Sequence, residues 1–174
     1  MKRYYTDSEI TKLLKELNIV CDTREQENEW IVGYFNTKKI PHTSRKLDAG
    51  DYSATLGDYS LENDVVIERK ADLDELCGNL TIDRERLERE FIRAKANGVR
   101  VFLLVEDGSW EDIILGNYRS KLKPNSFMAT LLAWQARYNL TIIFCRKSNT
   151  ARIIYGILYY TAREELKNGK YNLL

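Results

Sequence analysis

The stretch GDYSATLGDYSLENDVVIERK, residues 50–70, does most to define the fold. Gly-Asp-Tyr-Ser occurs in it twice, and the apolar run VVI then ends in the charged triplet ERK. Segments rich in β formers alternate with Gly-Asp and Asn-Asp turn pairs, which predicts an antiparallel β-meander. Because side chains alternate along a strand, we expect Glu68 and Lys70 on one face of the last strand and Arg69 on the other.

Helical and apolar patterns surround this meander. A capping box at residues 6–9 opens a helix that is expected over residues 7–17, and a terminal helix is expected over about 148–167. Short apolar runs predict buried strands, which are expected at residues 19–21, 99–105 and 141–145. This order predicts an α/β fold in which helices flank a mixed central β-sheet.

Composition limits the class of protein. The chain has 174 residues, 44% of them hydrophobic, which is enough for one substantial core and short for two. A net charge of +1 neither demands nor excludes a polyanionic partner, so any basic surface must be local. No apolar run approaches the roughly 18 residues of a membrane span. Three cysteines without CxxC spacing favour a reduced cytoplasmic protein.

Glu68 and Lys70 carry the candidate chemistry. A second carboxylate beside Glu68 would repel it by about 4 kcal/mol at about 4 Å, for an effective dielectric of about 20, unless a cation or proton intervenes. Mg²⁺ takes carboxylate oxygens and waters, and a lone His42 offers no histidine cluster for zinc. Lys70 would then hold or deprotonate a water, or stabilise charge on a phosphate. A solvated ion pair at a strand end is the alternative.

The order and spacing of these residues resemble those of the XPF-type structure-specific DNA endonucleases, a branch of the restriction-like D…ExK nuclease superfamily. The shared features are Asp22-x-Arg24-Glu25 after a strand, a Gly-Asp-Tyr, and Val66-Ile67-Glu68-Arg69-Lys70 followed after three residues by Asp74. The likeness covers about residues 18–160. The sequence also resembles the stand-alone, single-domain members of phages and bacteria, so no helix-hairpin-helix domain is expected.

The resemblance implies one restriction-endonuclease-like nuclease domain over residues 1–174 that cuts DNA with Mg²⁺ or Mn²⁺. It implies that a Gly-Asp aspartate and Glu68 hold the metal, with Asp22 as a further ligand, and that Lys70 is catalytic. It further implies that the site is lined by Asp22, Arg24, Glu25, Arg69 and Asp74. Branched, flap or junction DNA is the implied substrate, in the cytoplasm of a bacterial or phage-infected cell. A non-catalytic module that binds DNA or a partner is the alternative.

Two aspartates compete for the metal. The sequences that precede Asp51 and Asp58 fit the family pattern about equally well. In the longer family members a short segment separates the Gly-Asp pair from the Glu-Arg-Lys triplet, which favours Asp58. In the stand-alone members this segment is longer and variable, which favours Asp51. In a hairpin either aspartate could reach Glu68, depending on which residues form the turn. Asp51 is the preferred ligand and Asp58 the alternative.

Two basic segments could contact DNA. Arg84 opens a helix in which basic and acidic residues interleave, so phosphate contacts and a solvated helix face are both reasonable. Residues 116–124 hold Arg119, Lys121 and Lys123 without an acid, which suits a loop that touches a DNA backbone or a plain surface loop. The terminal helix is apolar almost all round, which favours a homodimer formed through it, as the resemblance also implies.

Overall fold

The computed structural model describes residues 3–171, and its contacts divide the chain into two compact units. The described part of the first unit comprises residues 3–66 and 151–171, and the second unit comprises residues 67–150. The expectation of a single nuclease domain stays a prediction. Among the described residues, no helix combines the length and the apolar character that crossing a membrane requires.

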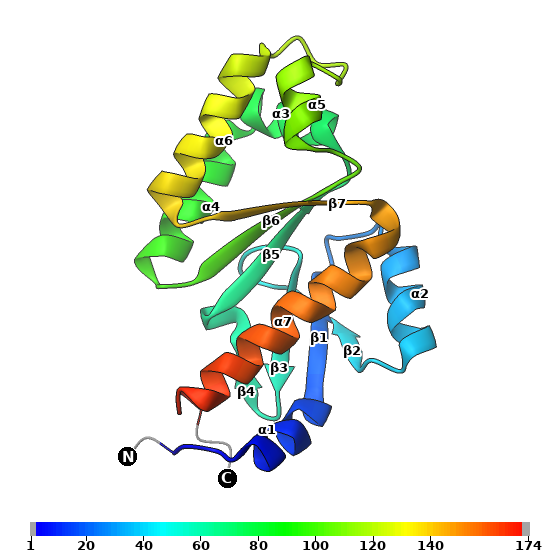
Figure 1. The fold of residues 1–174 in the computed structure, drawn as a ribbon, viewed down its shortest axis with the longest axis vertical. Helices are drawn as coiled ribbons and strands as arrows, with labels where there is room; N and C mark the ends of the chain where they lie inside the picture. Colours follow the sequence, from blue (N-terminus) through cyan, green and yellow to red (C-terminus); the bar gives the residue numbers. More distant parts are fainter. Residues whose placement is uncertain (1–2, 172–174) are drawn as a thin grey trace. The chain divides into compact units, whose positions relative to one another are not determined.

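The first unit is built on four strands (Figure 1). They are β1 (Leu17–Cys21), β2 (His42–Ser44), β3 (Tyr52–Leu56) and β4 (Tyr59–Ser60). β1 pairs in parallel with β2 and antiparallel with β3, while β3 and β4 form a hairpin. Gly57, with φ of 57°, takes the left-handed conformation that this tight turn requires. Residues 57–58 therefore form the turn of this hairpin, a point that the sequence alone did not decide.

Three helices complete the first unit: α1 (Asp7–Leu13), α2 (Glu29–Lys38) and α7 (Thr150–Lys167) from Ala151 onward. The buried face of α7 includes Ile154, Leu158, Ala162 and Leu166, which lie four residues apart. The first and last described segments of the chain lie side by side (Figure 1). The Tyr5 hydroxyl of the first segment donates to the Tyr171 carbonyl of the last at 3.1 Å.

The predicted helix over residues 7–17 is too long. Its capping box is present, with Thr6 Oγ1 accepting from the Glu9 amide at 3.3 Å and Glu9 Oε2 accepting from the Thr6 amide at 2.8 Å. The α-helix nevertheless ends at Leu13, and a 3₁₀ turn follows. Leu17 is the first residue of β1, where it is 1% exposed. In the sequence, this apolar residue lies at helical spacing from Leu13 and Leu14, so it looks like part of a further helical turn. The terminal helix likewise begins at Thr150 rather than residue 148.

The second unit holds the strands β6 (Arg100–Glu106) and β7 (Thr141–Cys145), which pair in parallel. β5 (Val65–Lys70) starts in the first unit and ends in the second. The sheet order is β2-β1-β3-β5-β6-β7, with β4 on β3. The predicted α/β class with a mixed sheet is confirmed. The sequence did not predict β2, which lies before the expected meander and joins β1 in parallel.

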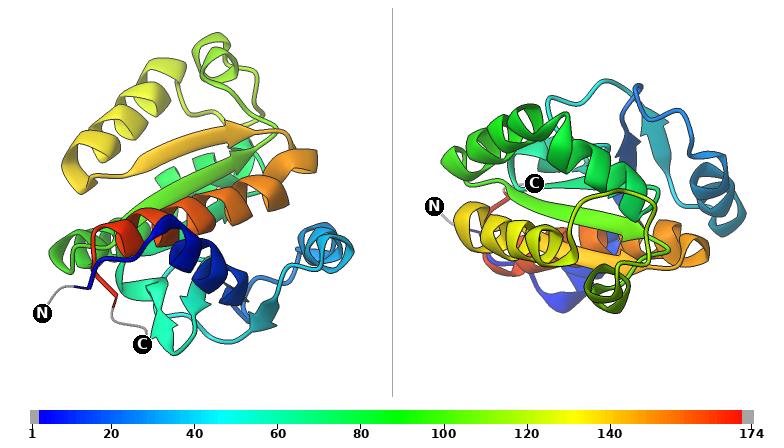
Figure 2. Two further views of the ribbon diagram at one scale, coloured as in Figure 1. Left: turned by 60° about the horizontal axis from the view of Figure 1, so that its bottom comes forward. Right: turned by 90° about the horizontal axis from the view of Figure 1, so that it is seen from above.

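Four helices belong to the second unit: α3 (Leu73–Thr81), α4 (Arg84–Ala96), α5 (Trp110–Leu115) and α6 (Pro124–Tyr138). α4 and α6 lie side by side (Figure 2). The Phe91 ring meets the fully buried Trp134 edge-on at 5.3 Å, and Trp134 Nε1 donates to Glu88 at 2.7 Å. A buried indole N–H needs such a partner, so this bond fixes how the two helices pack.

Candidate active site

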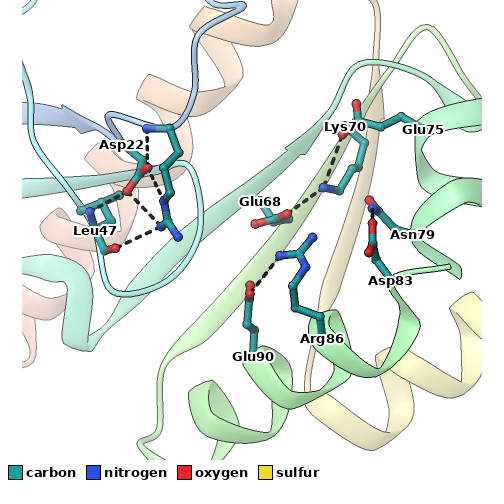
Figure 3. A network of polar contacts seen from close by, with 10 residues as sticks. Asp22, Leu47, Glu68, Lys70, Glu75, Asn79, Asp83, Arg86 and Glu90 are labelled. Atoms are coloured by element: carbon teal, nitrogen blue, oxygen red, sulfur yellow. Dashed lines mark hydrogen bonds and ion pairs between the residues drawn. The ribbon is translucent and has the colours of Figure 1, made fainter.

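Glu68 and Lys70 form a shielded ion pair at the end of β5. Their exposed fractions are 8% and 5%, and Lys70 Nζ donates to Glu68 Oε1 at 2.7 Å (Figure 3). The Lys70 ammonium also lies 3.5 Å from Glu75. Glu75 is held there because its amide donates to the Asp72 side chain, the N-cap of α3, at 2.7 Å. The strand end and the following helix thus surround one lysine with two carboxylates.

Arg69 points to the other face of β5, as strand alternation predicts. Its guanidinium lies 3.6 Å from Glu106 at the end of β6, and the side chains are 4% and 0% exposed. Within the part of the chain that the structure describes, neither Glu106 oxygen accepts a hydrogen bond. Glu106 therefore depends on Arg69 as the counter-charge of a buried ion pair. The predicted role of Arg69 in lining the site stays a prediction.

The basic residues of α4 point in different directions. Arg84 pairs with Glu88 at 3.1 Å, the same carboxylate that accepts from Trp134. Arg86 pairs with Glu90 at 3.1 Å, and its guanidinium extends from α4 toward Glu68 (Figure 3). Positions two apart lie about 200° apart on a helix with 3.6 residues per turn. A helical projection of the sequence, once the packed face was known, would have favoured Arg86 over Arg84.

Asn79 and Asp83 add to this polar region of the second unit. Asn79 Nδ2 donates to Asp83 Oδ2 at 3.5 Å, and both side chains appear beside Lys70 and Glu75 in Figure 3. Asn79 is 8% exposed, and its Oδ1 has no hydrogen-bond partner among the described residues. Sequence reasoning missed Asn79, because a single asparagine within an amphipathic helix gives no distinguishing signal.

Asp22 organises the polar end of the first unit. The carboxylate is 1% exposed and accepts four hydrogen bonds. Oδ1 accepts from the Arg24 amide and Nε, both at 2.7 Å, while Oδ2 accepts from the Leu47 amide at 2.6 Å and Arg24 Nη2 at 3.1 Å (Figure 3). Burial acts to raise the pKa of Asp22, but the bonds from Arg24 and Leu47 outweigh it and lower that pKa.

These four bonds favour a structural role for Asp22, because a carboxylate has about four acceptor sites. Arg24 also donates to the Leu47 carbonyl at 3.1 Å, and the Glu25 amide donates to the Asp22 carbonyl at 3.1 Å. Asp22 and Arg24 thus fix the loop that leads to Asp51. The half-buried Glu25 side chain is placed at the same end of β1.

The two competing aspartates lie at opposite ends of β3. The Asp22 amide donates to the Asp51 carbonyl at 2.8 Å, so the half-buried Asp51 sits beside the Asp22 loop. Asp58 is exposed in the hairpin turn, five residues of strand away. That length corresponds to about 17 Å. Ser53 Oγ donates to the Val65 carbonyl at 2.8 Å, which places the start of β5 beside the Asp51 half of β3.

Asp74 is turned toward a loop rather than toward Glu68. It accepts hydrogen bonds from the Arg119 amide at 2.7 Å, Arg119 Nε at 2.8 Å and the Ser120 amide at 3.1 Å. The bond from the Arg119 side chain lowers the pKa of Asp74 most. Burial opposes it, but the Arg119 and Ser120 amides add to the lowering, so the pKa is lowered overall. Arg119 is exposed, as are Lys121 and Lys123.

The start of α3 is also packed closely against the segment that follows β6. A Cβ atom on Gly108 would lie 2.8 Å from Leu73 Cγ, closer than side-chain carbons approach one another. Leu73 is 5% exposed and precedes Asp74 directly. The absence of a side chain at position 108 therefore makes room for the first residue of α3.

The donor set suits a hard divalent ion. No group of three or more metal-binding side chains gathers anywhere in residues 3–171. Mg²⁺ does not need such a group, because it keeps several waters and is bound through one or two carboxylates together with substrate phosphates. Glu68 offers a shielded carboxylate of this kind. His42 Nδ1, by contrast, lies 3.0 Å from the Ile40 carbonyl.

Comparisons with known proteins agree with this description. The sequence profile of the ERCC4 domain matches residues 21–157. XPF from Aeropyrum pernix superposes with a TM-score of 0.63 at 19% identity, covering 88% of this chain and 69% of that chain. XPF from Aeropyrum pernix in complex with DNA gives 0.61 at 20% identity, covering 90% and 68%. No curated protein sequence matches the chain. The structural likenesses confirm the restriction-endonuclease-like fold that was expected.

Proposed function

Because the chain belongs to the ERCC4-domain family, we propose that it is a metal-dependent DNA endonuclease that hydrolyses phosphodiester bonds. The observation that carries the proposal is the shielded pair of Glu68 and Lys70 at the end of β5. The likeness to the XPF structure solved with DNA supports DNA as the substrate. Branched, flap or junction DNA is the substrate geometry that the family resemblance favours.

The family resemblance favours Glu68 and Asp51 as the carboxylate ligands of a Mg²⁺ or Mn²⁺ ion. When bound, such an ion supplies a water of lowered pKa and charge stabilisation at a phosphate. Lys70 keeps the Glu68 carboxylate oriented through its 2.7 Å bond, and its ammonium, which has three protons, can also donate to a water or a phosphate oxygen. The low exposure of both side chains limits competition from bulk water.

Three observations support Asp51 over Asp58 as the second ligand. Asp51 is half-buried, its carbonyl is held by the Asp22 amide, and it follows Gly50, which has φ of 72°. Asp58 is exposed in a two-residue turn. A ligand held by its neighbours loses less conformational entropy on binding an ion than one at the tip of a turn. Asp22, whose oxygens already accept four bonds, is the less favoured additional ligand.

The phosphate contacts of the proposed nuclease come from the second unit. Arg86 extends toward Glu68 (Figure 3). Three exposed basic residues belong to the loop after α5: Arg119, Lys121 and Lys123. Arg84 is a weaker candidate, because it lies about 200° around α4 from Arg86 and its partner Glu88 is the carboxylate that accepts from Trp134. Exposed cations of this kind bind the sugar-phosphate backbone without reading sequence.

A homodimer formed through α7 and a cytoplasmic location belong to the same proposal. Tyr160 is 62% exposed on α7, and Tyr155 and Tyr159 beside it are only partly buried. Tyr160→Glu is expected to lower the mass measured by sedimentation equilibrium from that of a dimer to that of a monomer. The three cysteines are free thiols, which suits a reducing compartment.

Cleavage of labelled flap, fork, four-way and linear duplex DNA tests the proposed activity. The assays use Mg²⁺, Mn²⁺ or EDTA with wild type, Glu68→Gln, Asp51→Asn and Asp58→Asn. We expect metal-dependent cutting that falls by about 10²-fold or more in Glu68→Gln and Asp51→Asn, while Asp58→Asn serves as the matched control. DNA binding without cutting by wild type on every substrate would instead favour a non-catalytic DNA-binding module.

A further inference from the structure

Asp74 holds a segment that lies 45 residues further along the chain. Two of its three hydrogen-bond donors are backbone amides, those of Arg119 and Ser120, and the third is Arg119 Nε. All of these groups belong to the second unit. An ion pair between two exposed side chains contributes little, but a carboxylate that accepts two amides and a guanidinium restrains the backbone itself.

The segment it holds, residues 116–123, is closed on itself; we call it the basic loop. The Tyr118 hydroxyl donates to the Leu122 carbonyl at 2.7 Å, and the Leu122 amide donates to Ser120 Oγ at 3.2 Å. The Tyr118 ring packs edge-on against Phe127 of α6, with centroids 5.3 Å apart. With its interior fixed in this way, the basic loop turns three cations to solvent and contains no acid: Arg119, Lys121 and Lys123.

We propose that Asp74 is a positioning residue that latches the basic loop to α3, so that the loop forms a preset binding site for the DNA phosphate backbone. The proposal rests on the proposed nuclease function and deepens it. Only three residues separate Asp74 from Lys70, so the latch ties the loop to the helix that follows the Glu68-Arg69-Lys70 triplet. A loop that is ordered before DNA arrives binds more tightly than one that must be ordered on binding.

The latch and a metal-binding role for Asp74 predict different results. All three bonds of Asp74 go to the basic loop, which leaves the chemistry to Glu68 and Lys70. Removing an acid makes the protein more positive, so general electrostatics predicts that Asp74→Ala binds DNA more tightly. The latch predicts the opposite sign, because the freed loop must be ordered again each time DNA binds.

DNA binding without cleavage is the first measurement. Fluorescence anisotropy in EDTA, with a labelled flap DNA, compares wild type, Asp74→Ala, Asp74→Asn and Glu85→Ala. Glu85 is the matched control, because it is a 93% exposed acid of the same unit and its removal changes the charge equally. We expect Kd to rise about 3- to 10-fold in Asp74→Ala, less in Asp74→Asn, which keeps an acceptor for the amides, and not at all in Glu85→Ala.

Limited trypsin digestion reports on the loop without DNA. Trypsin can cut after Arg119 and Lys121. The Lys123–Pro124 bond resists trypsin and serves as a negative control. We expect cleavage after Arg119 and Lys121 to become about tenfold faster in Asp74→Ala and to stay at the wild-type rate in Glu85→Ala. Equal melting temperatures for the variants show that the difference is local.

The outcomes separate the two proposals. If wild type binds and cuts DNA but Asp74→Ala binds as tightly as Glu85→Ala, the latch is wrong and the nuclease stands. An unchanged tryptic rate in Asp74→Ala, or a loss confined to the cleavage rate with a raised Mg²⁺ requirement, also overturns the latch. A wild-type protein that neither binds nor cuts any DNA overturns the proposed function and the DNA role of the latch together.

Discussion

Lys70 Nζ lies 2.7 Å from Glu68 Oε1 on one face of β5, and neither side chain is more than 10% exposed. The two opposite charges therefore stabilise one another in a shielded position, and Glu75 at 3.5 Å is a second partner of Lys70. Replacing Lys70 by Met keeps the length of the side chain but removes its charge and its donors. We expect this substitution to lower single-turnover DNA cleavage by about 10²- to 10³-fold. Cleavage within about threefold of wild type would exclude a catalytic Lys70.

The buried pair of Arg69 and Glu106 predicts a strong effect on stability. Glu106→Ala leaves the Arg69 charge without its 3.6 Å partner, so the free energy of unfolding should fall by about 3–5 kcal/mol in urea titrations. The double substitution Arg69→Met, Glu106→Leu removes both charges and should recover most of that loss. A double variant that is as unstable as Glu106→Ala would show that packing, not the ion pair, is responsible.

Asp22 predicts a pH dependence of stability. Its pKa is lowered in the folded protein, so its contribution is complete above the unfolded value of about 3.9 and disappears as the pH falls through the folded pKa. At pH 7, Asp22→Asn should lower the free energy of unfolding by about 1.5–3 kcal/mol, because bonds to a charged acceptor are lost. The difference between variant and wild type should shrink at pH 3. Exposed Asp58→Asn, measured in parallel, should show no such change.

The direction of Arg86 predicts an asymmetry between two neighbouring arginines. Arg86→Ala should raise the KM for DNA about 3- to 10-fold, because its guanidinium extends toward Glu68 (Figure 3). Arg84→Ala should change KM by less than about twofold, since Arg84 is paired with Glu88 on the side of Trp134. Both substitutions remove one positive charge, so each controls for the other. Equal effects would assign the role to the helix as a whole.

Thiol reactivity reports on burial in the first unit. Burial, with the Glu25 carboxylate as a second cause, raises the pKa of Cys21 to about 11. At pH 8 its thiolate fraction is then about one in a thousand. Peptide mapping after brief alkylation at pH 8 should find the partly exposed Cys145 modified first and Cys21 spared. In denaturant all three cysteines should react alike. Early modification of Cys21 would show that the Cys21 end of β1 opens readily.

Local patterns in the sequence predicted the elements that local chemistry determines. The capping box at Thr6 and the opposed directions of Glu68 and Arg69 follow from residues a few positions apart. The length of the first helix could not be obtained in this way, because Leu17 fits both a helical stripe and a buried strand. Only the pairing of Leu17 with Leu56 separates the two.

Much of the candidate site depends on contacts between distant residues. Asp74 looks the same in the sequence whether it binds a metal or the amides of Arg119 and Ser120, and those donors are 45 and 46 residues away. Glu106 is a charge at the end of an apolar strand, which ordinarily indicates emergence into solvent. Its full burial follows from the neighbouring strand that carries Arg69. Partners of this kind are set by tertiary packing, for which one sequence contains no local signal.

The contact between Gly108 and Leu73 has a consequence for how sequences of this fold can diverge. The leucine side chain fills the space in which a Cβ at position 108 would stand. Change at either position alone is therefore costly: a larger residue at 108 meets the leucine, and a smaller one at 73 leaves a void beside the glycine. Relatives that carry alanine at 108 are expected to carry a smaller residue at 73. The two positions should covary, although 34 residues lie between them.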